Sequence, residues 1–198
     1  DEAVEHCTRG ASSWEWAGTP EDAAEPDIVL ACAGDIMTLE TVAAAELIKA
    51  RLPDIRLRVV NVVDLMTLKR PKDHPHGMSE LSFNELCTGN RDVIFAFHGY
   101  PGAIHHLVHG RPDADRFRVR GFIEQGTATT PFDMVVLNHL DRFNLVMDVA
   151  KQVPKLQPQA AHIKQRMRDK LNEHTRYIHE HGEDMPEIRD WKWPEAKA

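Results

Sequence analysis

The sequence predicts an α/β sandwich built around a central, mainly parallel sheet. Three apolar runs of strand length carry this prediction, at residues 28–33, 59–63 and 93–97. Runs of Val, Ile, Leu and Phe without polar alternation are typical of parallel strands that helices cover on both faces. A segment with helical periodicity follows the first run, as a crossover between parallel strands requires. Function is therefore expected at the ends of the strands.

The first 26 residues are predicted to be a lead-in, followed by the α/β domain with a helical C-terminal extension at 27–198. The lead-in is polar and rich in Ala and Glu, so we expect a short helix and then a linker that turns at 18–20. Asp1 is not a methionine, and we expect the chain to be a piece of a longer polypeptide. Tryptophans near both ends are interpreted either as core residues or as anchors against that larger protein: Trp14, Trp16, Trp191 and Trp193.

The first strand is expected to end at Gly34 and to lead into a helix that Thr38 caps. Pro53 stops this helix, because proline lacks the N–H that a helix interior needs. The apolar side chains of the helix recur at spacings of three and four, which places them on one face. They are Ala44, Leu47, Ile48 and Leu52.

The second strand is predicted over about 57–63, and it opens into a loop at 69–78 that is rich in Lys, Pro and His. A short helix at 79–86 follows, and Asp92 leads into the third strand. A fourth strand is predicted at 117–123, where basic and apolar residues alternate. The alternation puts three arginines on one face, which favours an edge strand or a strand that faces a partner: Arg116, Arg118 and Arg120.

Three helices are predicted in the last third of the chain. The first two cover 132–140, where Pro131 suits the first turn, and 141–153. The third covers 158–181 and ends at Gly182, a typical C-cap residue. It carries one stripe that faces the core: Ile163, Met167, Leu171, His174 and Ile178.

Composition argues against several classes of protein. The 198 residues carry a formal net charge of -7 with a pI near 5.9, which disfavours the broad basic surface of a nucleic-acid binder. No apolar stretch approaches the ~20 residues that span a bilayer, so no membrane partner is predicted. The cysteines, Cys7, Cys32 and Cys87, include no Cys-x-x-Cys pair. They favour a reducing cytoplasm over a disulfide framework.

Short motifs give only weak candidates for chemistry. Gly34 and Asp35 occupy the position of a phosphate-binding turn, but the Gly-x-Gly-x-x-Gly pattern is absent. A carboxylate facing the turn repels an anion by about 1–4 kcal/mol at ~4 Å, more than a helix dipole attracts it. Gly34-Asp35-Ile36 with Asn61 superficially resembles a thiamine diphosphate motif. However, Ile36 replaces its second glycine, and Asn61 lies inside a strand. No cofactor-binding residue is predicted.

The twelve histidines are not predicted to form a metal site. His105 and His109 have helical spacing, and His74 and His76 share a loop, but neither pair brings the further ligands and second shell that zinc needs. The default interpretation of these histidines is surface or packing. A basic run in the last helix is interpreted in the same way, as a solvated face: Lys164, Arg166, Arg168 and Lys170.

Six longer strings of the sequence are far more specific than these motifs. They are DIVLACAGDIMTLET at 27–41, RVVNVVDLM at 58–66, HPHG at 74–77, VIFAFHGYP at 93–101, VRG at 119–121 and GTATTPFDMVVLNHLDRFNLVM at 126–147. These strings closely resemble the C-terminal third of phosphoketolase, and the resemblance covers about residues 3–154. It implies a domain similar to the transketolase C-terminal domain, a three-layer sandwich whose mainly parallel, mixed sheet has about five strands.

The resemblance also implies an activity for the longer polypeptide. Phosphoketolases are carbon–carbon lyases of carbohydrate metabolism that depend on thiamine diphosphate and Mg²⁺. They cleave xylulose 5-phosphate, and often fructose 6-phosphate, with phosphate to acetyl phosphate and an aldose phosphate. The cofactor and metal sites belong to the other two domains, so the resemblance carries no catalytic residue onto this chain. It implies an assembly and dimer-packing role in a homo-oligomer for this domain, which is expected to be inactive alone and to bind no cofactor.

The carboxyl ends of the strands supply the candidate contacts with the other two domains or with the substrate. The alternative is an independent regulatory module that binds a nucleotide or another effector in the crevice at the same strand ends. A reading frame much longer than this segment favours the first interpretation. The candidate contact residues are Asp64, Met66, His98, Tyr100 and Pro101, together with Arg120 from the VRG string.

Overall fold

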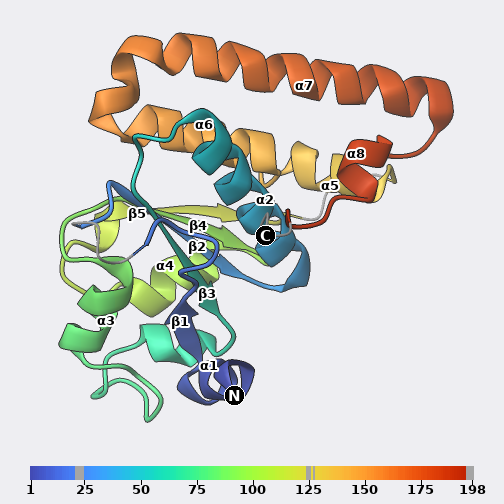
Figure 1. Ribbon diagram of the computed structural model, residues 1–198. Coiled ribbons are helices and arrows are strands. Elements are labelled where there is room, and N and C mark those ends of the chain that lie inside the picture. The colour runs from blue at the N-terminus through green and yellow to red at the C-terminus, as the bar shows by residue number, and fades with distance from the viewer. Residues whose placement is uncertain (21–24, 124–125, 127, 195–198) are drawn as a thin grey trace.

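The computed structural model describes residues 1–20, 25–123, 126 and 128–194, and it contains a five-stranded sheet between layers of helices (Figure 1). The predicted linker at residues 21–24, part of the loop before Pro131 and the last four residues lie outside the described part. The predicted three-layer α/β sandwich with a mixed sheet is confirmed. The strand order is β1-β3-β2-β4-β5. The strands are β1 (Ala11–Ser13), β2 (Ile28–Ala33), β3 (Leu57–Val62), β4 (Val93–Phe97) and β5 (Phe117–Gly121), all parallel except β1, which is antiparallel to β3.

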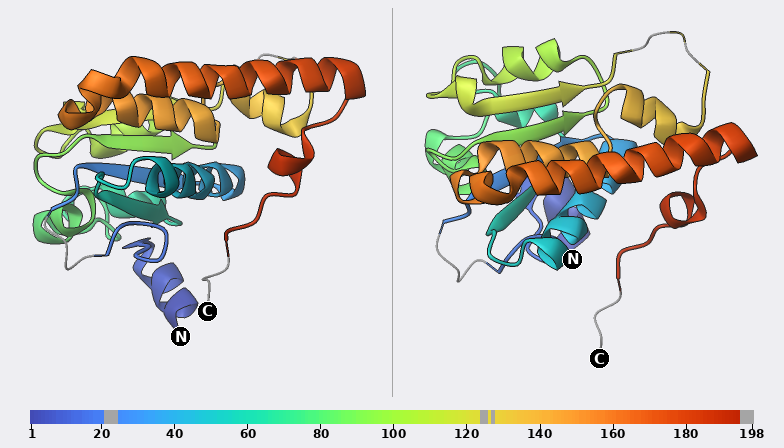
Figure 2. Two further views of the ribbon diagram at one scale, coloured as in Figure 1. Left: turned by 45° about the horizontal axis from the view of Figure 1, so that its top comes forward. Right: turned by 90° about the horizontal axis from the view of Figure 1, so that it is seen from above.

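Helices cover both faces of this sheet, as the two views in Figure 2 show. One face carries α2 and α6 with α7 outside them, and the other carries α3 and α4. Among the described residues, no helix combines the length and the apolarity needed to cross a membrane. The helices are α1 (Glu2–Arg9), α2 (Asp35–Arg51), α3 (Glu80–Cys87), α4 (Pro101–Val108), α5 (Pro131–Leu137), α6 (Arg142–Gln152), α7 (Ala160–His181) and α8 (Pro186–Arg189), with 3-10 turns η1 (Leu65–Leu68), η2 (Ala114–Arg116) and η3 (Pro154–Gln159).

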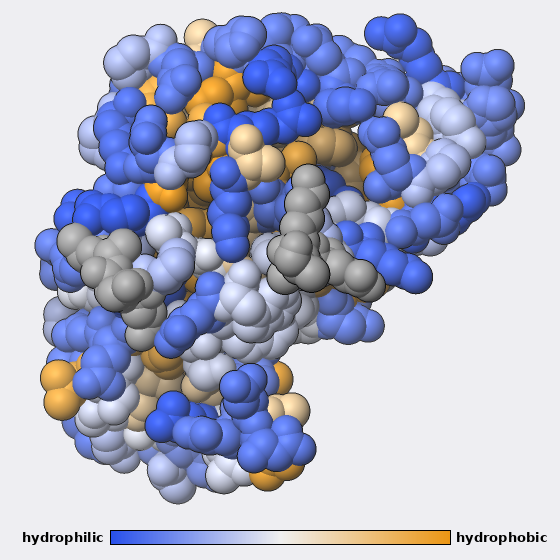
Figure 3. Space-filling model, in the orientation of Figure 1, coloured by the Kyte–Doolittle hydropathy of each residue, from blue (hydrophilic) through white to orange (hydrophobic). Residues whose placement is uncertain are grey.

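The apolar runs of the sequence supply two cores, one on each face of the sheet. Every residue of β2 is buried. Ile28 and Leu30 pack into the core beneath α2, α6 and α7, whereas Val29 and Ala31 pack into the core with α3 and α4. Because successive side chains of a strand point to opposite faces, an unbroken apolar run fills both cores. The outer side of α7 is hydrophilic, with hydrophobic residues visible beneath it (Figure 3).

Several elements differ from the prediction at their ends. The proposed cap at Thr38 is wrong, because α2 begins at Asp35 and the Thr38 hydroxyl donates back to the carbonyl of Gly34 at 2.7 Å. The helix predicted up to residue 140 ends at Leu137, since His139 adopts a left-handed φ of 55°. Asp141 then caps α6 by accepting from two backbone N–H groups. Neither β1 nor α4 was predicted.

A chain of hydrogen bonds ties the lead-in to the sheet. Asn61 of β3 is buried, and its amide oxygen lies 2.9 Å from Nε2 of His6 in α1. The Asn61 amide donates to the Thr38 hydroxyl at 2.9 Å and to Cys32 Sγ at 3.4 Å. A polar residue in the middle of an apolar strand is therefore satisfied. The tryptophans of the two ends also pack together, with Trp14 stacked on Trp16 and Trp193 edge-on to Trp16.

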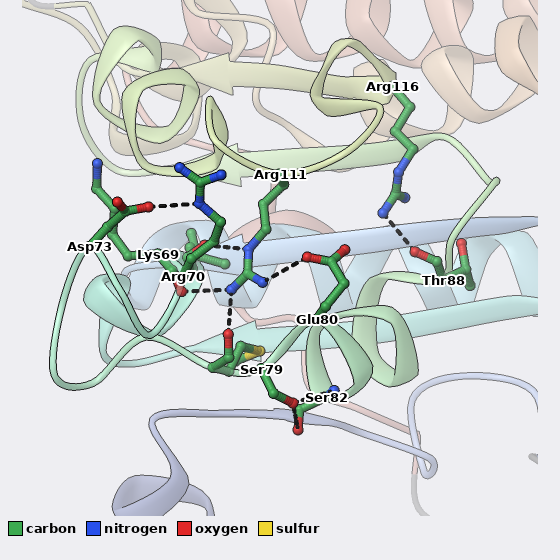
Figure 4. Close-up of polar contacts among 11 residues, drawn as sticks. Lys69, Arg70, Asp73, Ser79, Glu80, Ser82, Thr88, Arg111 and Arg116 are labelled. Atoms are coloured by element: carbon green, nitrogen blue, oxygen red, sulfur yellow. Dashed lines mark hydrogen bonds and ion pairs between the residues drawn. The ribbon is translucent and has the colours of Figure 1, made fainter.

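Two buried arginines hold the segment between β3 and β4 (Figure 4). Arg111 donates to the carbonyls of Leu68 at 3.0 Å, Lys69 at 2.6 Å and Met78 at 2.8 Å, and so closes the loop at both ends. Its guanidinium also contacts Glu80 at 3.4 Å. Burial of a guanidinium is costly unless its N–H groups find acceptors, as those of Arg111 do here.

The second of these arginines, Arg116, corrects a prediction. The alternation of the sequence placed Arg116 on the same exposed face as Arg118 and Arg120. Instead its guanidinium is buried and donates to the carbonyls of Cys87 at 2.7 Å and Thr88 at 2.6 Å, at the C-terminus of α3. The pattern failed because Arg116 precedes β5 and belongs to η2, so the alternation of the strand does not extend to it.

Candidate functional site: the carboxyl edge of the sheet

The four parallel strands end at one edge of the sheet, and the chain changes direction there. From β2 it crosses to β3 on one side, and from β3 it returns to β4 on the other side of β2. At such a switch point the connections leave in opposite directions and open a crevice between neighbouring strand ends. The turn after β2 and the loop after β4 therefore lie next to each other.

Gly34 and His98 make the closest contact at this switch point. Gly34 has φ of +100°, and a Cβ atom built on it would lie 2.6 Å from the Cβ of His98. The His98 imidazole is oriented by Asp35, since its Nδ1 lies 3.4 Å from Asp35 Oδ1. A hydrogen bond from the Ile36 N–H holds the pKa of Asp35 below its ordinary value, and His98 contributes in the same direction.

We expect Gly34→Ala to lower the free energy of unfolding by about 1–3 kcal/mol, because the backbone conformation is strained for any other residue. The added methyl group also collides with His98. Chemical denaturation gives the measurement. The matched control is Gly89→Ala, where a Cβ atom meets nothing within 4 Å and little change is expected. Equal stability of the two variants would contradict the prediction.

A second histidine–carboxylate pair lies after β3. Asp64 accepts from the Met66 N–H at 2.9 Å and lies 2.6 Å from His76 Nδ1. Burial acts to raise the pKa of Asp64, but the hydrogen bonds from Met66 and His76 outweigh it and lower the pKa. The loop that carries His76 is the loop closed by Arg111. In the described part of the chain, neither Nε2 of His76 nor Nε2 of His98 has a hydrogen-bond partner, so both can bond to another molecule.

The other predicted contact residues lie in different surroundings. Met66 and Tyr100 are exposed, at 38% and 62%. Pro101 is the first residue of α4 and contacts Gly121 at the end of β5. Arg120 is 40% exposed near the end of β5, and its guanidinium forms two 2.7 Å hydrogen bonds with Asp148 of α6, which raise its pKa.

Asp35 and His76 were missed as edge residues by the sequence analysis. The position of Asp35 at the edge could have been predicted from the sequence. Asp35 follows the end of β2 as His98 follows the end of β4, and parallel strands end at the same edge. The position of His76 could not have been predicted in this way, because it depends on how a long loop folds back toward Asp64. The arrangement offers oriented hydrogen-bonding groups among exposed apolar side chains, which suits contact with another protein surface.

Comparisons with known proteins agree on one family. The family model described as "XFP C-terminal domain" matches residues 1–193. "Probable phosphoketolase 2" of Nostoc sp. is 56% identical over 194 residues, and "Probable phosphoketolase" of Bradyrhizobium diazoefficiens is 56% identical over 193. Each match covers 98% of this chain but 24% of the relative, so the chain spans about a quarter of their length. The fold is similar to that of a transketolase from Leishmania mexicana, with a TM-score of 0.53 and 16% identity over 76% of this chain and 19% of that one.

Proposed function

The chain belongs to the phosphoketolase family as its C-terminal domain, and on this premise we propose that it serves the assembly of a longer, thiamine diphosphate-dependent enzyme. The observation that carries the proposal is the match of a C-terminal family model to residues 1–193, in relatives about four times as long. The proposed reaction of the whole polypeptide is the cleavage of xylulose 5-phosphate with inorganic phosphate, and fructose 6-phosphate is proposed as a second substrate. Its products are acetyl phosphate and an aldose phosphate.

The residues of this chain do not fit the cofactor. Gly34, Asp35 and Asn61 superficially resemble a diphosphate-binding motif. However, Asn61 lies inside β3, and its side chain is hydrogen-bonded to His6 and Thr38. Asp35 accepts from its neighbour Ile36 and faces His98. We therefore assign thiamine diphosphate and Mg²⁺ to the other domains and no catalytic step to this one.

The proposed role of this chain is to pack against its surroundings. Its proposed contacts are Asp64, Met66, His98, Tyr100, Pro101 and Arg120, and Arg120 also joins β5 to α6 through Asp148. We propose that the whole enzyme is a homo-oligomer. We also propose that it is cytoplasmic, a location with which the free thiols of Cys7, Cys32 and Cys87 are compatible.

A second candidate function is the binding of a small effector. The switch point between β2 and β4, with the oriented imidazole of His98, is the observation that favours it. The relatives favour a role in assembly over effector binding, because the matched domain is only about a quarter of their length.

We expect the isolated chain to form no acetyl phosphate above a blank without protein, because the groups that bind and activate the cofactor lie elsewhere. The assay supplies xylulose 5-phosphate, phosphate, thiamine diphosphate and Mg²⁺, and the full-length polypeptide is the positive control. Calorimetry should detect no binding of thiamine diphosphate to the chain at micromolar concentration. Turnover by the isolated chain, or none by the full-length polypeptide, would refute the proposed function.

A further inference from the structure

We propose that the carboxyl edge of the sheet is the surface on which the preceding part of the same polypeptide packs. This inference rests on the proposed function, because it takes the chain to be one domain of a longer protein. The contact would consist of apolar side chains from four strand ends, with the two histidine–carboxylate pairs between them. The apolar residues, here called the edge set, are Ile36, Leu39, Val63, Met66, Tyr100 and Ile123.

Exposure marks the edge set as unusual. Ten large hydrophobic side chains are exposed among the described residues, and the edge set accounts for six of them. Each follows the carboxyl end of a parallel strand: two after β2, two after β3 and one after each of β4 and β5. Tyr100 is 62% exposed and Val63 is 53% exposed. Exposed apolar side chains that gather at one site are typical of surfaces that another protein covers.

The path of the chain brings the preceding polypeptide to this edge. Because β1 is antiparallel to β3, Ala11 at the start of β1 pairs with Val62 at the end of β3. The carbonyl of Gly10 accepts from the N–H groups of Val63 at 2.8 Å and Asp64 at 2.9 Å. Helix α1, which precedes Gly10, therefore joins the domain beside the edge set, next to the start of β1 (Figure 1).

The relatives identify what precedes α1. The family model is that of a C-terminal domain, and this chain covers only 24% of each relative, so most of their length lies before the matched part. A polypeptide that enters at the carboxyl edge can cover the edge set without a long connection. The outer side of α7 is a poor alternative surface, because it is hydrophilic (Figure 3).

The polar groups at this edge complement an apolar contact. Asp35 and Asp64 each hold an imidazole through Nδ1, which leaves Nε2 of His98 and of His76 directed away from its carboxylate. Protein interfaces combine an apolar centre with fixed hydrogen-bonding groups. Fixed groups also reduce the entropy that is lost when two surfaces meet.

Hydrogen exchange of the full-length polypeptide and of the isolated chain tests the proposal. We expect exchange at least tenfold slower in the full-length protein for amides at 36–39, 63–66, 99–100 and 102–103. Amides of α3 around Leu81, an exposed side chain outside the edge set, should exchange equally in both. Equal exchange at the edge set would overturn the proposal. Protection that appears in the isolated chain as its concentration rises would also overturn it, because the occupant would then be a second copy.

Variants of the full-length polypeptide separate this proposal from the proposed function. Leu39→Ser combined with Tyr100→Ser should increase the rate of proteolytic release of the domain at least tenfold, whereas the matched control Leu81→Ser should not change it. An unchanged release rate in the double variant would contradict the docking. An active enzyme whose edge set exchanges freely would refute the docking alone. An inactive polypeptide whose edge set is protected would refute the function alone.

Discussion

Replacing Arg142 by methionine should lower the free energy of unfolding by about 3–5 kcal/mol, because it leaves a buried carboxylate unpaired. Glu40 of α2 and Arg142 of α6 are 3% and 4% exposed. Two side-chain hydrogen bonds of 2.9 and 2.7 Å join them, and the backbone N–H of Arg142 adds a third of 2.9 Å. Urea denaturation of the chain, followed by circular dichroism, measures the loss.

Two further variants make this result specific to the buried charge. Arg189→Met removes an exposed arginine that pairs with Glu183 and Asp190, and it should change stability by less than about 0.5 kcal/mol. Glu40→Leu combined with Arg142→Met removes both charges and should recover much of the loss. A double variant no more stable than Arg142→Met would show that packing, rather than the unpaired charge, causes the effect.

Replacing Arg111 by methionine should lower the free energy of unfolding by about 2–4 kcal/mol, because one buried and two partly buried carbonyls lose their donor, and each unsatisfied group costs roughly 1–3 kcal/mol before water reaches it. The carbonyls of Leu68, Lys69 and Met78 mark the two ends of the loop that carries His76. Once they are released, His76 should leave Asp64. Denaturation measures the stability, and faster exchange of the Met66 N–H reports the change at Asp64.

The controls for this prediction separate charge from geometry. Arg111→Lys keeps the charge but lacks the planar fork that reaches several carbonyls, so it should recover only part of the stability. Arg118→Met removes an exposed arginine of β5 that lies 3.4 Å from Asp92, and it should have little effect. A full recovery by lysine would show that the carbonyl contacts are not what holds the loop.

The sequence predicted those parts of the fold that depend on local pattern. The apolar runs of β2, β3 and β4 located three strands correctly, because strands buried on both faces must be apolar throughout. It missed β1, whose three residues, Ala-Ser-Ser, carry no periodicity and pair only because the edge of β3 is available. The predicted start of α2 was too late, because the capping rule favours Thr38 over Gly34 as the N-cap residue. Gly34 is required there by its close approach to His98, which the sequence does not reveal.

For the candidate site, the sequence predicted some of the residues that lie at the edge of the sheet but not which contacts they make. The rule that parallel strands end at one edge predicted the position of Asp64, His98 and Tyr100 after β3 and β4, but it says nothing about what each one contacts. The partner of Asp64 depends on a loop that the distant Arg111 holds closed. The pair of Glu40 and Arg142 joins residues 102 positions apart, and single residues of these types carry no signal for such a pairing.

The antiparallel strand β1 has a consequence for the order in which the domain folds. Its partner β3 lies far along the chain, with β2 and α2 between them, so β1 cannot join the sheet until β3 has been synthesised. Between the synthesis of β3 and the docking of β1, the outer edge of β3 is an unpaired apolar strand, and such edges template the association of unfolded chains. Strand β1 is synthesised before β3, so it is available to pair with the outer edge of β3 as soon as β3 forms. Its docking then removes this edge as a site of association. This short, serine-rich strand covers the edge of β3 without offering a long apolar edge of its own.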